Sequence, residues 1–150
     1  DRRRLLVTKQ EFVADILDNY KEMSRHGIEK QGPLLFIPPY EWHNEAIASW
    51  SKEFGLTLFN FTPGPRSNAD YTTPDMTGYL TSEEIYRSIL DYEKKDPHGL
   101  NGFILLVHIG THPDRQDKFY LRLGELIDDL RRKGYVFRRI DELLAGDSGN

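Results

Sequence analysis

Helix-like and strand-like segments alternate along the whole sequence, and this order limits the folds open to the chain. Some segments repeat apolar residues at helical spacing, and short, wholly apolar runs separate them. Strands that are apolar on both faces are typical of a parallel sheet covered on both sides. The predicted helices span residues 9–25, 44–54, 81–94 and 115–133 with a last turn at 140–144, and the predicted strands span 34–37, 56–61, 103–107 and 135–139. The pattern predicts an α/β fold with parallel strands and helical crossovers.

Two Thr-x-x-Glu sequences predict where the first and third helices begin. In Thr8–Glu11 and Thr81–Glu84, the threonine hydroxyl and the glutamate carboxylate can each accept from a free backbone N–H. Asn44 suits the start of the second helix, and Gly55 suits its end. Four strands are enough for a small open sheet or for about half of a (β/α) barrel. Both alternatives remain open at this point.

The composition excludes several classes of protein. The 150 residues are enough for one domain, and we expect residues 1–150 to form it. The absence of cysteine excludes disulfides, thiolate catalysis and Cys-based metal sites. The longest apolar run, residues 103–107, is too short to span a membrane. A formal net charge of -4 gives no electrostatic reason to expect nucleic-acid binding. The start at Asp1, without Met, indicates a piece of a longer protein.

Histidines and other residues that can act in catalysis follow the ends of the first three predicted strands. In parallel α/β folds, working residues lie beyond the carboxyl ends of the strands. Residues 38–43, 62–71 and 108–114 follow these strands, and they contain three of the five histidines. The sequence therefore predicts a functional site at this rim.

His108 ends the most hydrophobic predicted strand. Imidazole titrates near neutrality, so His108 could be a general acid or base, and a structural histidine bonded to a backbone group is an equal alternative. His112 and Asp114 could form a metal site with His108, although the sequence favours Asp114 as the cap of the next helix. Asp70 and Arg66 could tether a catalytic histidine or a substrate, or could belong to a solvated loop.

Pro38-Pro39-Tyr40 predicts a stiff, extended turn. Such a turn could direct a backbone N–H toward an oxyanion, with Tyr40 and Trp42 lining a groove. It could equally be a rigid connection whose aromatic side chains cover the core.

The order of these pieces resembles a known family. Phe36-Ile37-Pro38-Pro39-Tyr40, a strand ending in Leu106-Val107-His108, and the later Lys133-Gly134-Tyr135-Val136-Phe137 are similar to the later half of a polysaccharide deacetylase of carbohydrate esterase family 4, the NodB-like deacetylases. The resemblance runs from the first helix to the end of the chain. It implies part of a distorted (β/α) barrel that removes N-acetyl groups from a glycan.

The resemblance also implies roles for individual residues. His108 would be the general acid that protonates the leaving amine, and Asp70, followed by Tyr71, would orient His108. Leu106 would line the pocket for the acetyl methyl group, and Tyr40 would offer its backbone N–H to the tetrahedral oxyanion. The substrate groove would contain Pro39, Tyr40, Trp42, Leu106 and Arg66.

In that family a divalent metal, usually zinc, is held by one Asp and two His. The Thr-Phe-Asp-Asp and His-x-x-x-His motifs that supply the ligands and the base are absent from this sequence. Ile37 stands where the family has an Arg that steadies the catalytic Asp, and Arg66 could substitute for it. We therefore expect the carboxyl-terminal portion of a zinc-dependent deacetylase domain, without its metal-binding portion and inactive in isolation.

Other functions remain open. The main alternative is a non-catalytic module that binds carbohydrate, or that forms a homo-oligomer through exposed strand edges and apolar faces. A metal-free hydrolase using His108 with Asp70 ranks last, because no serine or cysteine nucleophile is convincingly placed. The expected partner is an N-acetylated polysaccharide. By resemblance alone, the expected location is extracellular, periplasmic or at the cell surface.

Overall fold

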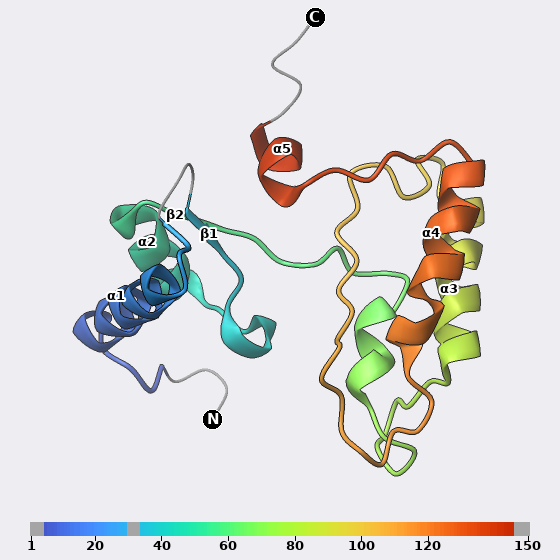
Figure 1. Ribbon diagram of the computed structural model, residues 1–150, viewed down its shortest axis with the longest axis horizontal. Coiled ribbons are helices and arrows are strands. Elements are labelled where there is room, and N and C mark those ends of the chain that lie inside the picture. Colours follow the sequence, from blue (N-terminus) through green and yellow to red (C-terminus); the bar gives the residue numbers. More distant parts are fainter. Residues whose placement is uncertain (1–4, 30–33, 146–150) are drawn as a thin grey trace, which may run out of the picture. The chain divides into compact units, whose positions relative to one another are not determined.

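The computed structural model describes residues 5–29 and 34–145, which belong to two compact units, residues 1–60 and 61–150 (Figure 1). The predicted start at Asp1 lies outside the described residues. The expectation of a single domain over residues 1–150 stays a prediction.

The first unit is an α/β unit with one parallel strand pair. Its elements are helix α1 (Lys9–Arg25), strand β1 (Leu34–Phe36), the 3-10 turn η1 (Pro39–Glu41), helix α2 (Glu45–Phe54) and strand β2 (Leu56–Leu58). Strands β1 and β2 pair in parallel, with Leu34 opposite Leu56. Five side chains form the buried core between strands and helices: Phe12, Ile16, Leu34, Ile47 and Leu56.

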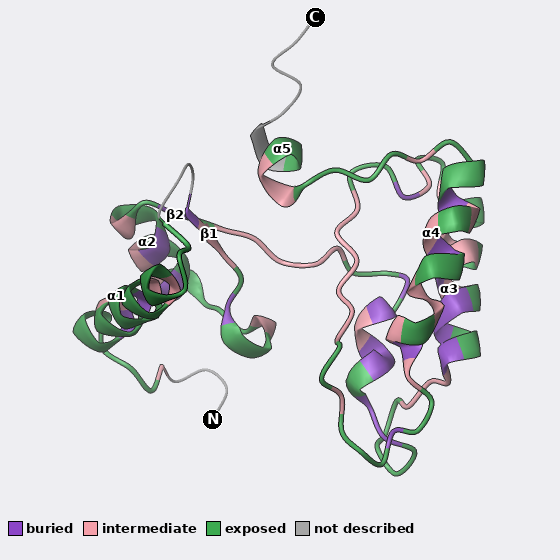
Figure 2. Cartoon of the chain, in the orientation of Figure 1, coloured by how far each residue is buried: buried purple, intermediate pink, exposed green. Residues whose placement is uncertain are grey.

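The second unit is mainly helical. Its elements are the 3-10 turn η2 (Ser67–Tyr71), helix α3 (Ser82–Lys95), the 3-10 turn η3 (Phe119–Arg122), helix α4 (Leu123–Arg132) and helix α5 (Ile140–Ala145). Buried residues concentrate along α3 and in η2 (Figure 2). The core combines η2, α3, the segment that follows α3, η3 and α4, through Ala69, Ile85, Tyr86, Ile89, Leu100, Phe119, Leu126 and Leu130.

Local signals predicted several helix boundaries correctly. Thr8 and Thr81 cap α1 and α3, and both capping boxes are complete. The Asn44 side chain accepts from the Ile47 backbone N–H at 3.0 Å at the start of α2. Gly55 ends that helix with a left-handed φ of 84°. These caps satisfy backbone groups that a helix end leaves without partners.

Two predicted strands are wrong. Residues 103–107 and 135–139 take part in no sheet among the residues the structure describes. A strand needs a hydrogen-bonded neighbour, and residues 103–107 have isolated bonds instead of a ladder. The Thr62 N–H donates to the Ile104 carbonyl at 2.9 Å, the Ile104 N–H donates to Thr62 Oγ1 at 3.1 Å, and the Phe103 N–H donates to the Leu100 carbonyl at 3.1 Å. The structure thus confirms parallel α/β pairing in the first unit, and residues 5–29 and 34–145 form no barrel.

The long helix predicted over residues 115–133 is also shorter than expected. An irregular segment runs to residue 118, η3 follows, and α4 begins only at Leu123. The side chain of Arg115 points into the interior and bonds loop carbonyls, which removes the expected first turn. Asp114 therefore does not cap a helix. In the described part of the chain, no helix has the length and apolar character of a membrane span.

Candidate functional site

The second unit brings Asp70 and His108 together from positions 38 residues apart. Asp70 lies in η2, and its side chain is 1% exposed. The η2 turn follows Arg66, whose backbone has a left-handed φ of 56°. His108 follows residues 103–107, the segment that Thr62 holds through two hydrogen bonds.

Both carboxylate oxygens of Asp70 contact His108. Asp70 Oδ2 accepts the backbone N–H of His108 at 2.6 Å, and Asp70 Oδ1 lies 2.7 Å from the ring Nδ1. The Tyr71 ring packs edge-on against the imidazole, with centroids 5.6 Å apart and an interplanar angle of 71°. The ring is thereby held on two sides.

This arrangement can transfer a proton through the other ring nitrogen. A carboxylate at Nδ1 favours a proton on that atom and fixes the orientation of the ring. The His108 side chain remains 31% exposed, and its Nε2 has no hydrogen-bond partner among residues 5–29 and 34–145. The geometry suits a general acid or base that acts on a molecule arriving from solvent.

Two other predicted residues lie near this pair in the sequence. Leu106, two residues before His108, is half-buried. Arg66 is exposed, and its guanidinium donates to the Gly78 carbonyl at 2.9 Å, whereas both oxygens of Asp70 are occupied by His108. The hydrogen bonds of Arg66 thus belong to the loop rather than to Asp70.

The residues around His112 do not provide a metal site. His112 Nδ1 accepts the backbone N–H of Asp114 at 3.2 Å, and both side chains are exposed. Within the described ranges, no three His, Asp or Glu side chains converge as metal ligands. Residues 5–29 and 34–145 therefore offer no ligand set for the zinc ion that the resemblance implies.

The predicted Pro-Pro-Tyr turn is a strained turn in the first unit. Tyr40 and Glu41 both have left-handed backbones, with φ of 56° and 57°. The Glu41 N–H donates to the Pro38 carbonyl at 2.8 Å, while the Tyr40 N–H has no partner in the described part of the unit. Left-handed conformations in non-glycine residues are uncommon and often mark functional positions.

Aromatic side chains lie beside this turn. Tyr40 is 83% exposed and Trp42 is 63% exposed. Pro39 and Trp42 line a pocket of about 520 Å³, together with Phe12 and Phe36. Trp42 lines this pocket and Tyr40 does not, and a substrate groove at these residues stays a prediction.

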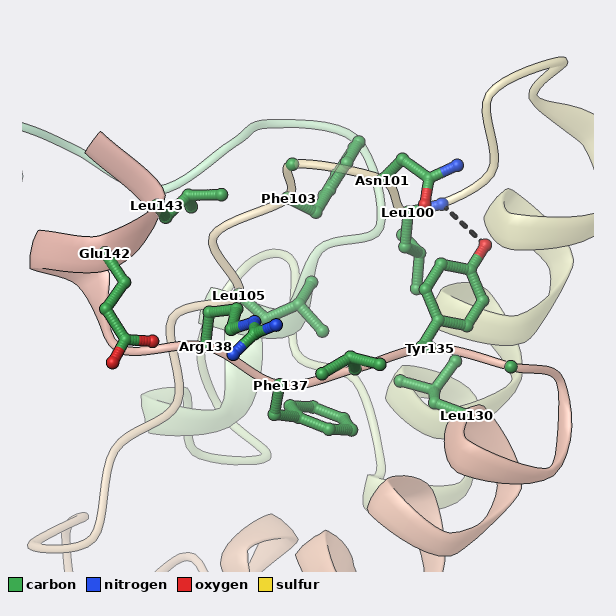
Figure 3. A pocket seen from close by; sticks show the side chains of 13 residues that line it. Leu100, Asn101, Phe103, Leu105, Leu130, Tyr135, Phe137, Arg138, Glu142 and Leu143 are labelled. Carbon is green, nitrogen blue, oxygen red and sulfur yellow. Dashed lines mark hydrogen bonds between the residues drawn. The ribbon is translucent and has the colours of Figure 1, made fainter. Parts of the chain in front are cut away.

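A second, open groove of about 810 Å³ lies in the other unit, beside the segments wrongly predicted as strands. Phe103, Leu105 and Phe137 are among its lining residues, and the Leu100 N–H donates to the Tyr135 hydroxyl at 2.9 Å across one end (Figure 3). Neither Asp70 nor His108 lines it. This groove is therefore separate from the candidate acid–base pair.

Sequence reasoning missed one residue near the site, Arg115. It is completely buried, donates to the carbonyls of Thr72 and Leu80 at 2.7 and 3.0 Å, and stacks 5.2 Å from the Tyr79 ring centroid. Its neighbours are Asp, Gln and Lys, so the local pattern predicts an exposed helix start. No sequence signal distinguishes Arg115 from the charged residues around it.

The fold and site define a mixed α/β chain with a buried carboxylate paired to a half-exposed histidine. The chain is 30% identical over 132 residues to a peptidoglycan-N-acetylglucosamine deacetylase of Bacillus cereus, covering 87% of this chain and 53% of the relative. The chain thus spans about half the length of the curated relative it matches. No family model matches the sequence.

Proposed function

We propose that this chain supplies the proton-donating part of a polysaccharide deacetylase site that hydrolyses N-acetyl groups of a glycan. The observation that carries the proposal is the Asp70–His108 pair, with one ring nitrogen engaged and the other open. The similarity to a peptidoglycan deacetylase supports the same class of substrate. By this proposal the chain derives from the barrel domain of such an enzyme.

The proposed step assigned to His108 is protonation of the leaving group. Water adds to the acetamide carbon and gives one proton to a general base, which the resemblance assigns to a motif absent from this sequence. The C–N bond then breaks and the departing nitrogen takes a proton from His108 Nε2. The products are acetic acid, which ionises to acetate, and a free amine. Asp70 keeps the ring in one orientation, with Nε2 free to face the substrate. A correctly placed general acid accelerates such a step by about 10²- to 10⁴-fold.

Other roles follow from the resemblance and extend the proposal. The Tyr40 N–H, which has no partner in the described part of its unit, would donate to the oxyanion. Leu106 would contact the acetyl methyl group, and Trp42 would stack on a sugar ring. Zinc, and a location outside the cytoplasm, are likewise proposals taken from the resemblance. The described residues do not form a set of zinc ligands. The proposed reaction steps are therefore assigned to side chains of this chain and none to a metal ion.

The test is acetate release by the natural protein that contains this chain. N-acetylated peptidoglycan and chitin oligosaccharides are incubated with the protein, with added zinc and with a chelator. His108→Ala should reduce release by about 10²-fold or more. His112→Ala removes a neighbouring exposed imidazole and should change it less than twofold. Equal release by wild type and His108→Ala would contradict the proposal.

One observation favours a second candidate function, glycan binding without cleavage. Tyr40 and Trp42 are strongly exposed aromatic residues in the same unit, as expected for a sugar-stacking surface. Titration with chitin oligosaccharides should then quench the fluorescence of Trp42, while Trp42→Phe removes the response and leaves the signal of half-buried Trp50. Binding without any acetate release would favour this second function.

A further inference from the structure

Arg115 is a buried cation without a carboxylate partner. Its side chain is fully buried, and no Asp or Glu lies within ion-pairing distance in residues 5–29 and 34–145. Its two terminal nitrogens donate to backbone carbonyls, and its Nε has no partner in the same ranges. Burial of a charge is costly unless it is paired. Arg115 is thus a poor choice if stability alone determines the residue at this position.

The contacts of Arg115 join the two segments that carry the acid–base pair. Thr72, whose carbonyl it binds, follows Asp70 and Tyr71 at the end of η2. Arg115 itself belongs to the segment that follows His108, and its backbone N–H donates to the His112 carbonyl at 3.1 Å. One side chain therefore connects the segment after Asp70 to the segment after His108.

Hydrogen bonds of Lys118 and Asp117 fix the position of the segment after His108. Lys118 Nζ donates to the carbonyls of Thr111 and His112 at 3.2 and 2.7 Å. Asp117 accepts the backbone N–H of Ser82 at the start of α3. Because the segment is fixed at both of these points, the hydrogen bonds of Arg115 can determine where the end of η2 lies.

We propose that Arg115 is a positioning residue that holds Asp70 against His108 by fixing the carbonyls of Thr72 and Leu80. The planar guanidinium presents several donors in a rigid fork, so it can hold two carbonyls at fixed separation. Its catalytic consequence rests on the proposed function, whereas the geometry of the pair can be measured without any substrate.

The test is NMR of the 150-residue chain. In the wild type, the His108 Nδ1–H proton should be visible and protected from exchange with water, and Asp70→Asn should abolish this signal and so assign it. Arg115→Met should accelerate its exchange at least tenfold. The matched control is Arg122→Met, because Arg122 also stacks on a tyrosine, Tyr86, but within the described ranges its guanidinium bonds only Glu83 and Glu125. The control should leave the exchange rate unchanged.

Wild-type protection of the Nδ1–H proton in a folded Arg115→Met chain would overturn the proposal. If Arg115→Met does not fold, Arg115→Lys decides the question, because an ammonium lacks the fork geometry and should give intermediate protection. Wild-type protection in Arg115→Lys would then overturn the proposal. In an active protein, Arg115→Met should lower kcat with little change in KM. Absence of acetate release from the wild type would contradict the proposed function and leave the NMR result standing.

Discussion

Asp70 binds His108 twice, once at the main chain and once at the ring. The backbone N–H fixes where residue 108 lies, and the contact at Nδ1 fixes how its ring is turned. Because Asp70 is almost completely buried, water cannot replace it as an acceptor. The same carboxylate therefore contributes to folding and determines the orientation of the candidate acid.

Asp70→Asn should weaken folding and activity together. Asparagine keeps one acceptor oxygen, so either the backbone N–H or the ring of His108 loses its acceptor. We expect the free energy of unfolding in urea to fall by about 1–3 kcal/mol, as for a buried group left without a partner. Asp91→Asn, at an exposed position, should stay within about 0.5 kcal/mol of wild type. An unchanged urea midpoint for Asp70→Asn would contradict this account of the pair.

Ile89→Ala should strongly destabilise the second unit. Ile89 on α3 is completely buried in the core that also packs η2. Removal of its side chain should leave a cavity and cost about 2–5 kcal/mol, measured by urea denaturation. Ile109→Ala makes the same change at a residue that is 80% exposed and should cost less than about 0.5 kcal/mol. Equal losses of unfolding free energy in Ile89→Ala and Ile109→Ala would contradict the placement of Ile89 in the core of the second unit.

Tyr86 should make the fold sensitive to alkaline pH. Burial, followed by its hydrogen bond to Asp129, raises the pKa of the Tyr86 phenol from 10.0 to about 12. The folded state thus favours the neutral phenol, so this contribution is fully present below pH 10 and is lost as the pH rises through about 12.

Measurement of the urea midpoint between pH 9 and pH 12 checks this effect. The decline with pH should be smaller in Tyr86→Phe, which has no phenol to ionise. Tyr71→Phe, at a half-exposed position, should keep the wild-type slope. Parallel declines in wild type and Tyr86→Phe would remove Tyr86 as the cause.

Tyr40→Gly should be more stable than Tyr40→Ala. The backbone of Tyr40 is left-handed, a conformation that costs a non-glycine residue about 1 kcal/mol and costs glycine almost nothing. The urea midpoints of the two variants should therefore differ by about that amount. Ala48→Gly, on the exposed side of α2, should have the opposite sign, because glycine destabilises a helix interior. A more stable alanine variant at position 40 would exclude strain at this turn.

Local signals in the sequence were sufficient for the helix starts. Thr8, Asn44 and Thr81 act through hydrogen bonds to residues three positions away, so a short stretch of sequence contains the whole cause. The Asp70–His108 contact spans 38 residues; the loop sequence offered a histidine tether as one of several alternatives, and the resemblance to a family singled it out. The roles of these two residues stay predictions.

The wrong predictions, a strand at residues 103–107 and a helix start at Arg115, both depend on contacts with residues distant in the sequence. Residues 103–107 have a strand-like composition, yet the structure gives them isolated hydrogen bonds to Thr62 and Leu100 rather than a ladder, and composition cannot reveal whether a ladder partner is present. Arg115 misled the helix prediction for a related reason. A charged residue is normally exposed, and nothing nearby in the sequence indicates that Thr72 and Leu80 will surround it with carbonyls.

The burial of Arg115 has a practical consequence for protein engineering. A library selected only for heat resistance would retain methionine or leucine at position 115 wherever the avoided desolvation of a cation outweighs the two carbonyls left without a donor. The selected variants would have a higher melting temperature, but we expect the His108 imidazole to be held less closely against the Asp70 carboxylate. Thermostabilisation of this chain should therefore hold position 115 constant.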